Sequence, residues 1–190
     1  MTTDQHPTSV RADAARNRER LIEAAAAAFA ESGTGVALEA IAKRAGVGIG
    51  TLYRHFPARD ALVEAVYRRE IQTLADTVDA ALAEHPGDEA LRTWMVQFLE
   101  YVTTKRGMGD AIKSIVAVTP DLRGVVFGML HGSLDRLVAA GIADGTIRAD
   151  ARPDDVLQAM TVVFHLPDEP GWKLQAQRLL DLLVDGLRVR

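Results

Sequence analysis

The side chains best suited to intermolecular chemistry lie between residues 48 and 55. Thr51, Tyr53, Arg54 and His55 stand there within five positions, beside two glycines. Hydroxyl, imidazole and guanidinium groups bind phosphate oxygens and base edges of nucleic acids. Each helical glycine costs about 1 kcal/mol relative to alanine, so a purely structural helix would not favour them. Close approach of the backbone to another surface explains these glycines better.

Two short helices and a tight turn are predicted to position these side chains. The first helix spans residues 38–45, and the second spans residues 49–56 and stops before Pro57, because the residue before proline disfavours the helical region. Gly46 stands where a sharp turn needs a positive φ. The hydrophobic residues between the two helices would form their shared core: Leu38, Ile41, Val47, Leu52 and Phe56.

An enzyme is the first alternative class, and the sequence disfavours it. Cys is absent, and the five histidines share no metal-ligand spacing. No nucleophile elbow, His-Glu-x-x-His motif or phosphate loop is present. We therefore expect no catalytic residue, no metal and no cofactor.

The charge distribution favours the N-terminal part as the part that binds an anion. Residues 1–60 carry eight Lys and Arg against seven Asp and Glu, whereas the whole chain has a net charge of −4. Basic residues precede or open the first helix and flank residues 49–56: Arg11, Arg16, Arg18, Arg20, Arg54 and Arg59. This asymmetry favours nucleic-acid binding by the N-terminal part, although the arginines before residue 21 could equally form a solvated face.

The run from residue 41 to residue 62 resembles the TetR (tetracycline-repressor-like) family of bacterial transcription regulators. The matching residues are Ile41-Ala42, Ala45-Gly46-Val47, Gly50-Thr51-Leu52-Tyr53, His55-Phe56 and Leu62, with the spacing that the family shows. The resemblance extends back through Ile22 to Phe29 and Gly33, so it covers about residues 14–67. Two departures are Ala37 and Ala58, which stand where the family often has a capping Ser or Thr.

The resemblance implies a homodimer that binds a double-stranded DNA operator through a helix-turn-helix. Thr51, Tyr53 and His55 fall on positions that contact phosphates or bases, and Arg59 falls on a phosphate-contacting position. For His55 the alternative is a core histidine, and Tyr53 could mainly pack. The resemblance places sequence specificity at four further positions: Gly48, Ile49, Gly50 and Arg54.

The fold class predicted is all-α, with about nine helices. We expect a flexible arm at residues 1–13, a three-helix DNA-binding domain at residues 14–58, and a helical ligand-binding and dimerisation domain at residues 59–190. Helices are expected at residues 14–32, 38–45, 49–56, 59–84, 88–106, 110–118, 120–143, 153–166 and 172–187. Without a secretory signal or a run of 18 apolar residues, the chain is expected to be cytoplasmic and to span no membrane.

A small-molecule inducer is predicted to bind between the helices of the C-terminal domain. Aromatic and methionine side chains suit an adaptable, largely apolar cavity, so the ligand is expected to be small and largely hydrophobic. Core packing is the alternative for each residue. The predicted lining is Trp94, Phe98, Tyr101, Met108, Ile112, Ile115, Val126, Phe127, Leu130, His131 and Phe164.

The last two helices are predicted to form the dimer interface. The final helix is apolar over so much of its circumference that it must be buried on two sides, and a two-fold mate supplies the second side. The predicted interface comprises Val156, Met160, Val163, Trp172, Ala176, Leu179, Leu180, Leu183 and Leu187. A protein-interaction adaptor that has lost DNA binding is the second alternative class, which the intact residues 51–54 argue against.

Overall fold

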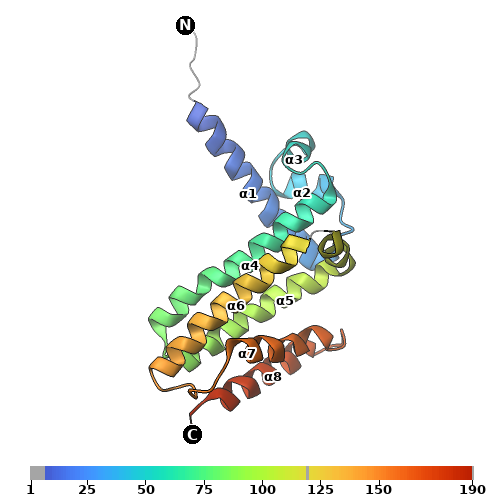
Figure 1. Cartoon of the computed structure of the whole chain (residues 1–190). Coiled ribbons are helices and arrows are strands. Elements are labelled where there is room, and N and C mark those ends of the chain that lie inside the picture. The colour runs from blue at the N-terminus through green and yellow to red at the C-terminus, as the bar shows by residue number, and fades with distance from the viewer. Residues whose placement is uncertain (1–6, 119, 190) are drawn as a thin grey trace. The chain divides into compact units, whose positions relative to one another are not determined.

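The structure is a computed structural model that describes residues 7–118 and 120–189; the side chains of residues 7–11, 107, 110, 113, 114, 116–118 and 120 are not described. Its regular elements are helices (Figure 1). They are α1 (Pro7–Ser32), α2 (Leu38–Arg44), α3 (Ile49–His55), α4 (Arg59–Glu84), α5 (Gly87–Val118), α6 (Pro120–Ala143), α7 (Pro153–Met160), the 3-10 helix η1 (Thr161–His165) and α8 (Trp172–Leu187). The all-α prediction is confirmed.

Two compact units divide the chain. The first contains the described residues up to Arg69 together with residues 104–118, and the second contains residues 70–103 and 120–189. The division therefore falls within α4 and α5. Residue 58, where we predicted a domain boundary, is an element boundary, because α4 begins at Arg59.

The first helix begins earlier than predicted. We expected residues 1–13 to form an arm, but α1 already starts at Pro7; residues 1–6 lie outside the described part. Proline is tolerated in the first turn of a helix, and no helix breaker follows it. The helix ends where expected, at Ser32, and Gly33 follows with a φ of 71°.

The turn between α2 and α3 has the predicted geometry. Gly46 has a φ of 66°, and the N–H of Val47 donates to the carbonyl of Ala42 over 3.0 Å. Leu38, Ile41, Leu52 and Phe56 are buried. Two short helices are thus held at a fixed angle by a shared apolar core.

Two helix boundaries differ from the prediction. The expected helices 88–106 and 110–118 form one element, α5, that is interrupted at Gly109 by non-helical angles (φ 21°, ψ −104°). The expected helix 153–166 tightens from α7 into η1 at Thr161. The described residues therefore contain eight α-helices and one 3-10 helix. The predicted break near residue 108 is confirmed at Gly109, and the chain is helical on both sides of it.

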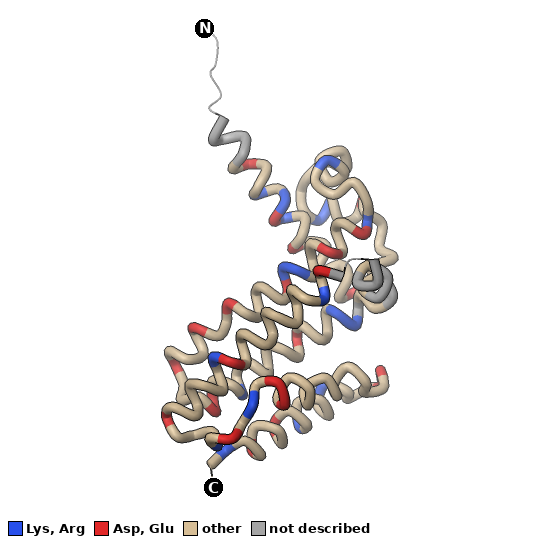
Figure 2. Tube along the Cα trace, in the orientation of Figure 1, with Lys and Arg blue, Asp and Glu red and all other residues tan. Residues whose placement is uncertain are grey.

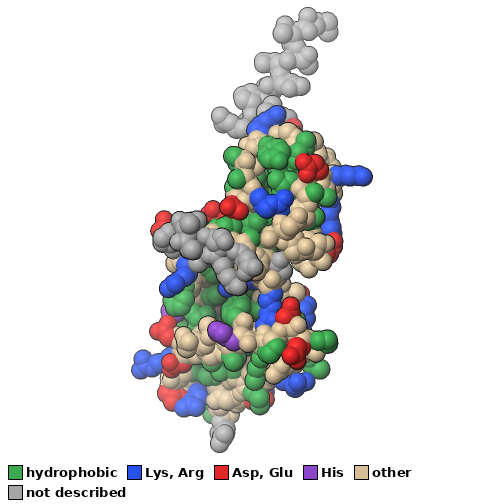
Figure 3. Space-filling model, turned by 90° about the vertical axis from the view of Figure 1, so that its right-hand side faces the viewer, with side chains coloured by type: hydrophobic (Ala, Val, Ile, Leu, Met, Phe, Trp, Pro, Cys, Tyr) green, Lys and Arg blue, Asp and Glu red, His purple; other side chains and the backbone are tan. Residues whose placement is uncertain are grey.

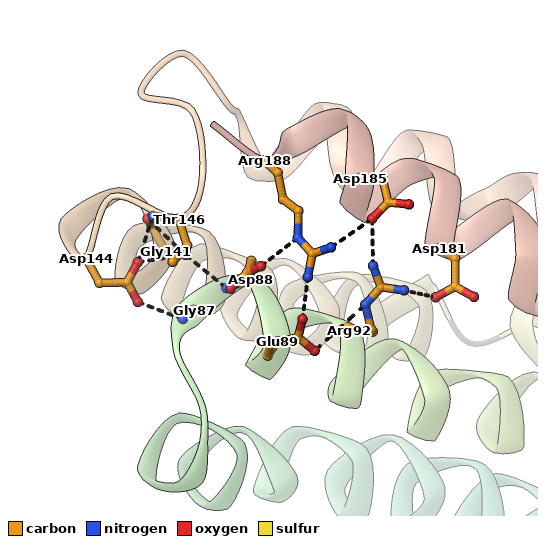
Figure 4. Close-up of polar contacts among 10 residues, drawn as sticks. All are labelled: Gly87, Asp88, Glu89, Arg92, Gly141, Asp144, Thr146, Asp181, Asp185 and Arg188. Atoms are coloured by element: carbon orange, nitrogen blue, oxygen red, sulfur yellow. Dashed lines mark hydrogen bonds and ion pairs between the residues drawn. The ribbon is translucent and has the colours of Figure 1, made fainter. Parts of the chain in front are cut away.

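In the second unit, the start of α5 lies against the end of α6. A side chain at Gly87 would meet the backbone of Gly141 at 2.2 Å, so these helices touch through glycine. Asp144 accepts a 2.7 Å hydrogen bond from the N–H of Gly87, and Thr146 donates to the same carboxylate. These contacts join the α6–α7 loop to the first turn of α5 (Figure 4).

An ion-pair network, here called the C-terminal clasp, ties the end of α8 to the start of α5 (Figure 4). Arg188 donates to Asp88 over 2.6 Å and to Asp185 over 3.1 Å, and it also pairs with Glu89. Arg92 donates to Asp185 over 2.7 Å and pairs with Asp181 as well. The bond to Asp88 is the main reason that the pKa of Arg188 is raised. The clasp fixes the end of α8 against the start of α5.

One described helix, α6, is long and apolar enough over Asp121–Ala143 to cross a membrane by length and composition. Its buried residues form one stripe against the second unit's core, including Leu122, Val126 and Leu130. On its exposed side, Arg136 pairs with Asp79 of α4. Core packing accounts for only part of its apolar composition, because 39% of this segment is buried.

Candidate nucleic-acid interface

Helix α3 separates its residues sharply between an inward and an outward side. Leu52 is fully buried, whereas Tyr53 is 47% exposed. Gly48, Gly50 and Arg54 are also exposed, and Ile49, Thr51 and His55 are half-buried. The predicted DNA-contacting residues of residues 48–55 therefore reach the surface of the first unit.

The inward side of α3 packs against α1 and α2. Phe56 is 2% exposed, and the Arg18 guanidinium lies 5.2 Å from the centre of its ring. This cation–π contact joins α1 to the end of α3. His55 lies beside the same ring, with 6.3 Å between ring centres. The neighbouring Phe therefore takes the core position, and His55 keeps a partly exposed imidazole.

Positive charge on the first unit is only partly neutralised. Arg16 pairs with Asp13, and Arg44 forms two hydrogen bonds with Glu31, of 2.8 and 2.9 Å. The Arg44 bonds lower the pKa of Glu31. By contrast, the other described basic side chains on α1, α2 and α3 form no ion pair with a described residue: Arg18, Arg20, Lys43 and Arg54. Figure 2 marks the Lys and Arg positions along the chain in blue. The side chain of Arg11 lies outside the described part.

Arg59 has a different environment from the one predicted for a phosphate contact. Its Nη1 donates to the carbonyl oxygens of Thr34 and Val36, over 2.6 and 2.7 Å. Its side chain is half-buried. One end of the guanidinium is thus occupied within the protein, because the loop between α1 and α2 reaches the first turn of α4. Sequence spacing alone could not reveal a contact over 25 residues.

Comparison with known proteins gives a consistent result over both halves of the chain. The family model for bacterial regulatory proteins of the tetR family matches residues 21–66. The model for the C-terminal domain of SbtR-like transcriptional regulators matches residues 85–189. The chain belongs to the TetR family.

Two solved TetR-family structures resemble nearly the whole chain. The TetR transcriptional regulator SCO0520 from Streptomyces coelicolor is 44% identical, with a TM-score of 0.80 over 90% of this chain and 98% of that chain. A TetR transcription regulatory protein from Mycobacterium vanbaalenii is 34% identical, with a TM-score of 0.75 over 95% of this chain and 99% of that chain. The predicted family, with its helix-turn-helix, is confirmed.

Curated relatives match over a shorter part of the chain, about a third of it. The HTH-type transcriptional regulator SAB2452 of Staphylococcus aureus (strain bovine RF122 / ET3-1) is 42% identical over 65 residues, which is 34% of this chain. The match spans about a third of the length of that relative, 35%.

The residues predicted to line a ligand site of this TetR-family chain belong to both units. Trp94, Phe98, Tyr101, Val126 and Leu130 are buried in the second unit, with Phe164 half-buried there. Met108, Ile112 and Ile115 are buried in the first unit. Their contact with a ligand stays a prediction.

Aromatic side chains on α5 form a cluster with an identifiable structural role. Trp94 stacks on Phe98 with 6.0 Å between ring centres, and Phe164 meets Phe98 edge-on at 5.8 Å. The Trp94 indole N–H donates to the carbonyl of Leu74 over 3.1 Å. These contacts explain the aromatic content of α5 as core packing, which was the alternative for each of these residues.

Two predicted ligand contacts on α6 lie at the surface. Phe127 is 56% exposed, and its ring stacks on His131 with 6.3 Å between centres. His131 approaches Asp154 of α7, with 3.0 Å between Nε2 and Oδ1. An enclosed cavity does not fit the exposed Phe127, whereas His131 is half-buried and its ligand contact stays a prediction.

The predicted dimer residues divide between the interior and the surface of the second unit. Five are buried within the chain itself: Val156, Met160, Val163, Ala176 and Leu180. Trp172, Leu179, Leu183 and Leu187 are half-buried. The exposed apolar residues of the same helices are Val162, Leu174 and Leu182, at 45%, 58% and 68%. Leu174 and Leu182 are eight residues apart on α8 and lie away from its buried residues Ala176, Leu180 and Val184. That spacing was the available sequence signal.

Proposed function

We propose that this TetR-family chain is a homodimeric, sequence-specific DNA-binding transcriptional regulator, and that it acts as a repressor. The observation that carries the proposal is the division of α3: Tyr53 and Arg54 point outward, while Leu52 anchors the helix below them. A short helix held rigidly by its inner side, with donors on its outer side, suits the major groove. The proposed contacts are Gly48, Ile49, Gly50, Thr51, Tyr53, Arg54 and His55.

Arg54 carries the clearest electrostatic contribution to DNA binding. It is exposed and forms no ion pair with a described residue. A guanidinium can donate two hydrogen bonds to one guanine edge or neutralise a phosphate. Arg18, Arg20 and Lys43 add positive charge on the same unit. The net charge of −4 for the whole chain is therefore compatible with DNA binding by one part of it.

Homodimerisation is proposed through α7, η1 and α8. Val162 is exposed on η1, and Leu174 and Leu182 are exposed on α8. Figure 3 shows, in green, that hydrophobic side chains reach the surface on one face of the molecule. Exposed leucines on one helix suit a two-fold interface, in which the same surface of both subunits is buried. The buried residues of the same helices, such as Ala176 and Leu180, would support the interface from below. A dimer would present two α3 helices about 34–36 Å apart, one DNA turn.

A small, largely hydrophobic ligand is proposed to bind the C-terminal helical domain and to release the repressor from DNA. The support is chemical and comes from the methionines of α5, Met95 and Met108, because flexible methionine side chains can repack around an apolar ligand. Coupling between ligand and DNA sites is typically worth about 1–3 kcal/mol. Since its target would be chromosomal DNA, the proposed site of action is the cytoplasm.

The proposal is tested by selecting duplexes from a random DNA library with the wild-type protein and measuring binding by fluorescence anisotropy. We expect a near-palindromic duplex to be enriched. Tyr53→Ala should weaken binding at least about tenfold, equivalent to about 1.4 kcal/mol, while the dimer stays intact. Phe127→Ala removes another exposed aromatic ring, on α6, and should leave DNA affinity unchanged. Failure to enrich any duplex would contradict the function, and equal affinity of Tyr53→Ala would contradict the assigned contact.

A further inference from the structure

Arg59, the first residue of α4, connects that helix to a distant loop. Its Nη1 donates to two carbonyl oxygens, those of Thr34 and Val36, over 2.6 and 2.7 Å. Both acceptors lie in the segment between Ser32 and Leu38, which joins α1 to α2. Hydrogen bonds from a charged donor are about twice as strong as neutral ones. The start of α4 is therefore fixed to the α1–α2 loop.

Helix termini show why these two bonds matter locally. Ala37 is the N-cap of α2 and makes no side-chain capping bond, so the loop before α2 gains no order from a cap. Gly35, in the middle of that loop, is exposed, and no atom beyond its chain neighbours lies within 4 Å of the point a Cβ would take there. A positive side chain at the first position of α4 is disfavoured by the helix dipole. The two hydrogen bonds from Arg59 to carbonyl oxygens offset that penalty and order the loop between α1 and α2.

These bonds create a second connection between α4 and the helix pair α2–α3. The first connection is covalent and consists of residues 56–58, which link α3 to α4. The second runs from Arg59 through the loop to α2, which packs on α3. Ile41 of α2 and Leu52 of α3 are both fully buried. One connection would act as a hinge, whereas two connections at different points resist rotation.

We propose that Arg59 is a positioning residue for DNA binding: it locks α2 and α3 to the start of α4, so that the orientation of α3 follows α4. This inference rests on the proposed function. Its consequence for regulation is that any movement passed along α4 reaches α3 through the Arg59 bonds as well as through residues 56–58. A direct phosphate contact by Arg59 is the competing role, and the two roles differ in their dependence on salt.

The test is a salt titration of DNA affinity for wild type and Arg59→Ala, with the duplex selected by the wild-type protein. At a temperature where the variant is fully folded and dimeric, we expect binding to weaken about tenfold. The slope of log affinity against log salt should stay equal to that of wild type, because no phosphate contact is lost. Hydrogen exchange should become faster in residues 33–38 of the variant.

Two matched arginine variants calibrate the measurement. Arg54→Ala removes an exposed arginine of α3 and should reduce the salt slope by about one unit if it contacts phosphate. Arg68→Ala removes an arginine of α4 that pairs with Glu64 over 2.9 Å, and it should change neither affinity nor slope. Arg59→Lys, which can still donate to carbonyl oxygens, should recover part of the affinity.

The outcomes separate the possible roles of Arg59. A slope reduced by about one unit in Arg59→Ala would overturn the inference in favour of a phosphate contact. Unchanged affinity, with only a lower melting temperature, would overturn it in favour of a purely structural role. If the wild-type protein selects no duplex, the proposed function fails and this inference fails with it. If the wild type binds and Arg59→Ala binds equally well, only this inference fails.

Discussion

Helix α3 and the aromatic part of α5 use similar residue types for different purposes. Tyr53 on α3 is 47% exposed, whereas Trp94 and Phe98 on α5 are at most 1% exposed. Trp94 also satisfies its indole N–H with the carbonyl of Leu74. Both segments were predicted to be binding regions, α3 because of its hydroxyl, imidazole and guanidinium groups and α5 because of its aromatic and methionine content. Exposure and hydrogen bonding distinguish the two segments. The side chains of α3 are accessible to a partner, whereas the aromatic side chains of α5 pack in the core.

The arginines of the same two regions differ in a parallel way. Arg92, near the start of α5, pairs with Asp181 and Asp185 of α8. Arg54 on α3 forms no ion pair with a described residue. An arginine already paired within the fold contributes to stability, and an exposed one without an acidic neighbour is available to an anion. The four predictions below test this contrast between a recognition surface and a structural core.

The largest expected effect is the loss of Trp94. Trp94→Ala removes a fully buried side chain together with its hydrogen bond to Leu74. The transfer and cavity terms for such a change amount to about 3–5 kcal/mol. We expect the free energy of unfolding, measured by urea denaturation, to fall by that amount. A loss below about 1 kcal/mol would mean that the α5 cluster is loosely packed and closer to a ligand site than to a core.

A second large effect is expected at the proposed dimer surface. Leu182→Asp places a charge at a leucine that is 68% exposed on α8. If a partner covers this position, the dissociation constant of the dimer should rise about 100-fold, equivalent to about 2.7 kcal/mol, as seen by light scattering over a dilution series. Ala83→Asp, at an exposed position of α4, is the control and should stay dimeric. A dimer of unchanged affinity in Leu182→Asp would move the interface elsewhere.

Gly50 and Gly128 offer an intermediate and sharper test. Both are exposed helical glycines, and a Cβ at either would meet nothing within 4 Å. Alanine at each position should therefore raise the free energy of unfolding by up to about 1 kcal/mol. On α3, however, the added methyl group would stand between the backbone and DNA. We expect Gly50→Ala to stabilise the protein and weaken DNA binding about tenfold.

The matching variant on α6 tests whether the loss of DNA affinity is specific to α3. Gly128→Ala should stabilise the protein to a similar degree and leave DNA affinity unchanged, with the dimer checked by light scattering. Tight DNA binding by Gly50→Ala would show that α3 does not need close backbone approach.

The smallest expected effect is a loss of stability of the second unit at acid pH, caused by the protonation of Asp144. Burial tends to raise the pKa of Asp144, but hydrogen bonds from the N–H of Gly87 and from Thr146 outweigh it, so the pKa lies below its ordinary value. The stability from these bonds is present above the ordinary pKa, about 3.9, and is lost as pH falls through the lower folded pKa. Since Asp144 is exposed, the contribution is a few tenths of a kcal/mol at most.

Urea midpoints of wild type and Asp144→Asn, measured between pH 7 and pH 2.5, should test this linkage. The wild type should be slightly more stable at neutral pH, and the difference should disappear in the acid range. A difference that grows toward low pH would contradict the assigned role of this carboxylate.

Prediction from sequence succeeded where the decisive relations are local. The burial of Leu52 and Phe56 and the exposure of Tyr53 follow from helical periodicity within α3, and the positive φ of Gly46 follows from the turn. The predicted break in α5 appears at Gly109. The start of α1 was predicted too late, because residues 8–13 show no hydrophobic pattern and yet contain nothing that stops a helix.

Prediction was weakest where roles depend on which side of a helix is covered by another. Phe127 was expected in an enclosed site, and it is exposed. Ala176 and Leu180 were expected at a dimer interface, and they are buried within the chain, whereas Leu182 lies outside. All three residues of α8 are apolar or small, so composition could not separate them. Only the placement of the neighbouring helices distinguishes the inner stripe from the outer one.

By itself, the amino-acid sequence determined the all-α class, the family and the division of α3 into an anchored and an outward side. Each of these depends on spacing within a few helical turns, which 3.6 residues per turn converts directly into faces. The tertiary structure alone decided the partner of Arg59, which lies 23 and 25 residues away at Val36 and Thr34. Hydrogen bonds between distant segments depend on how the chain returns in space, and no local pattern encodes that return.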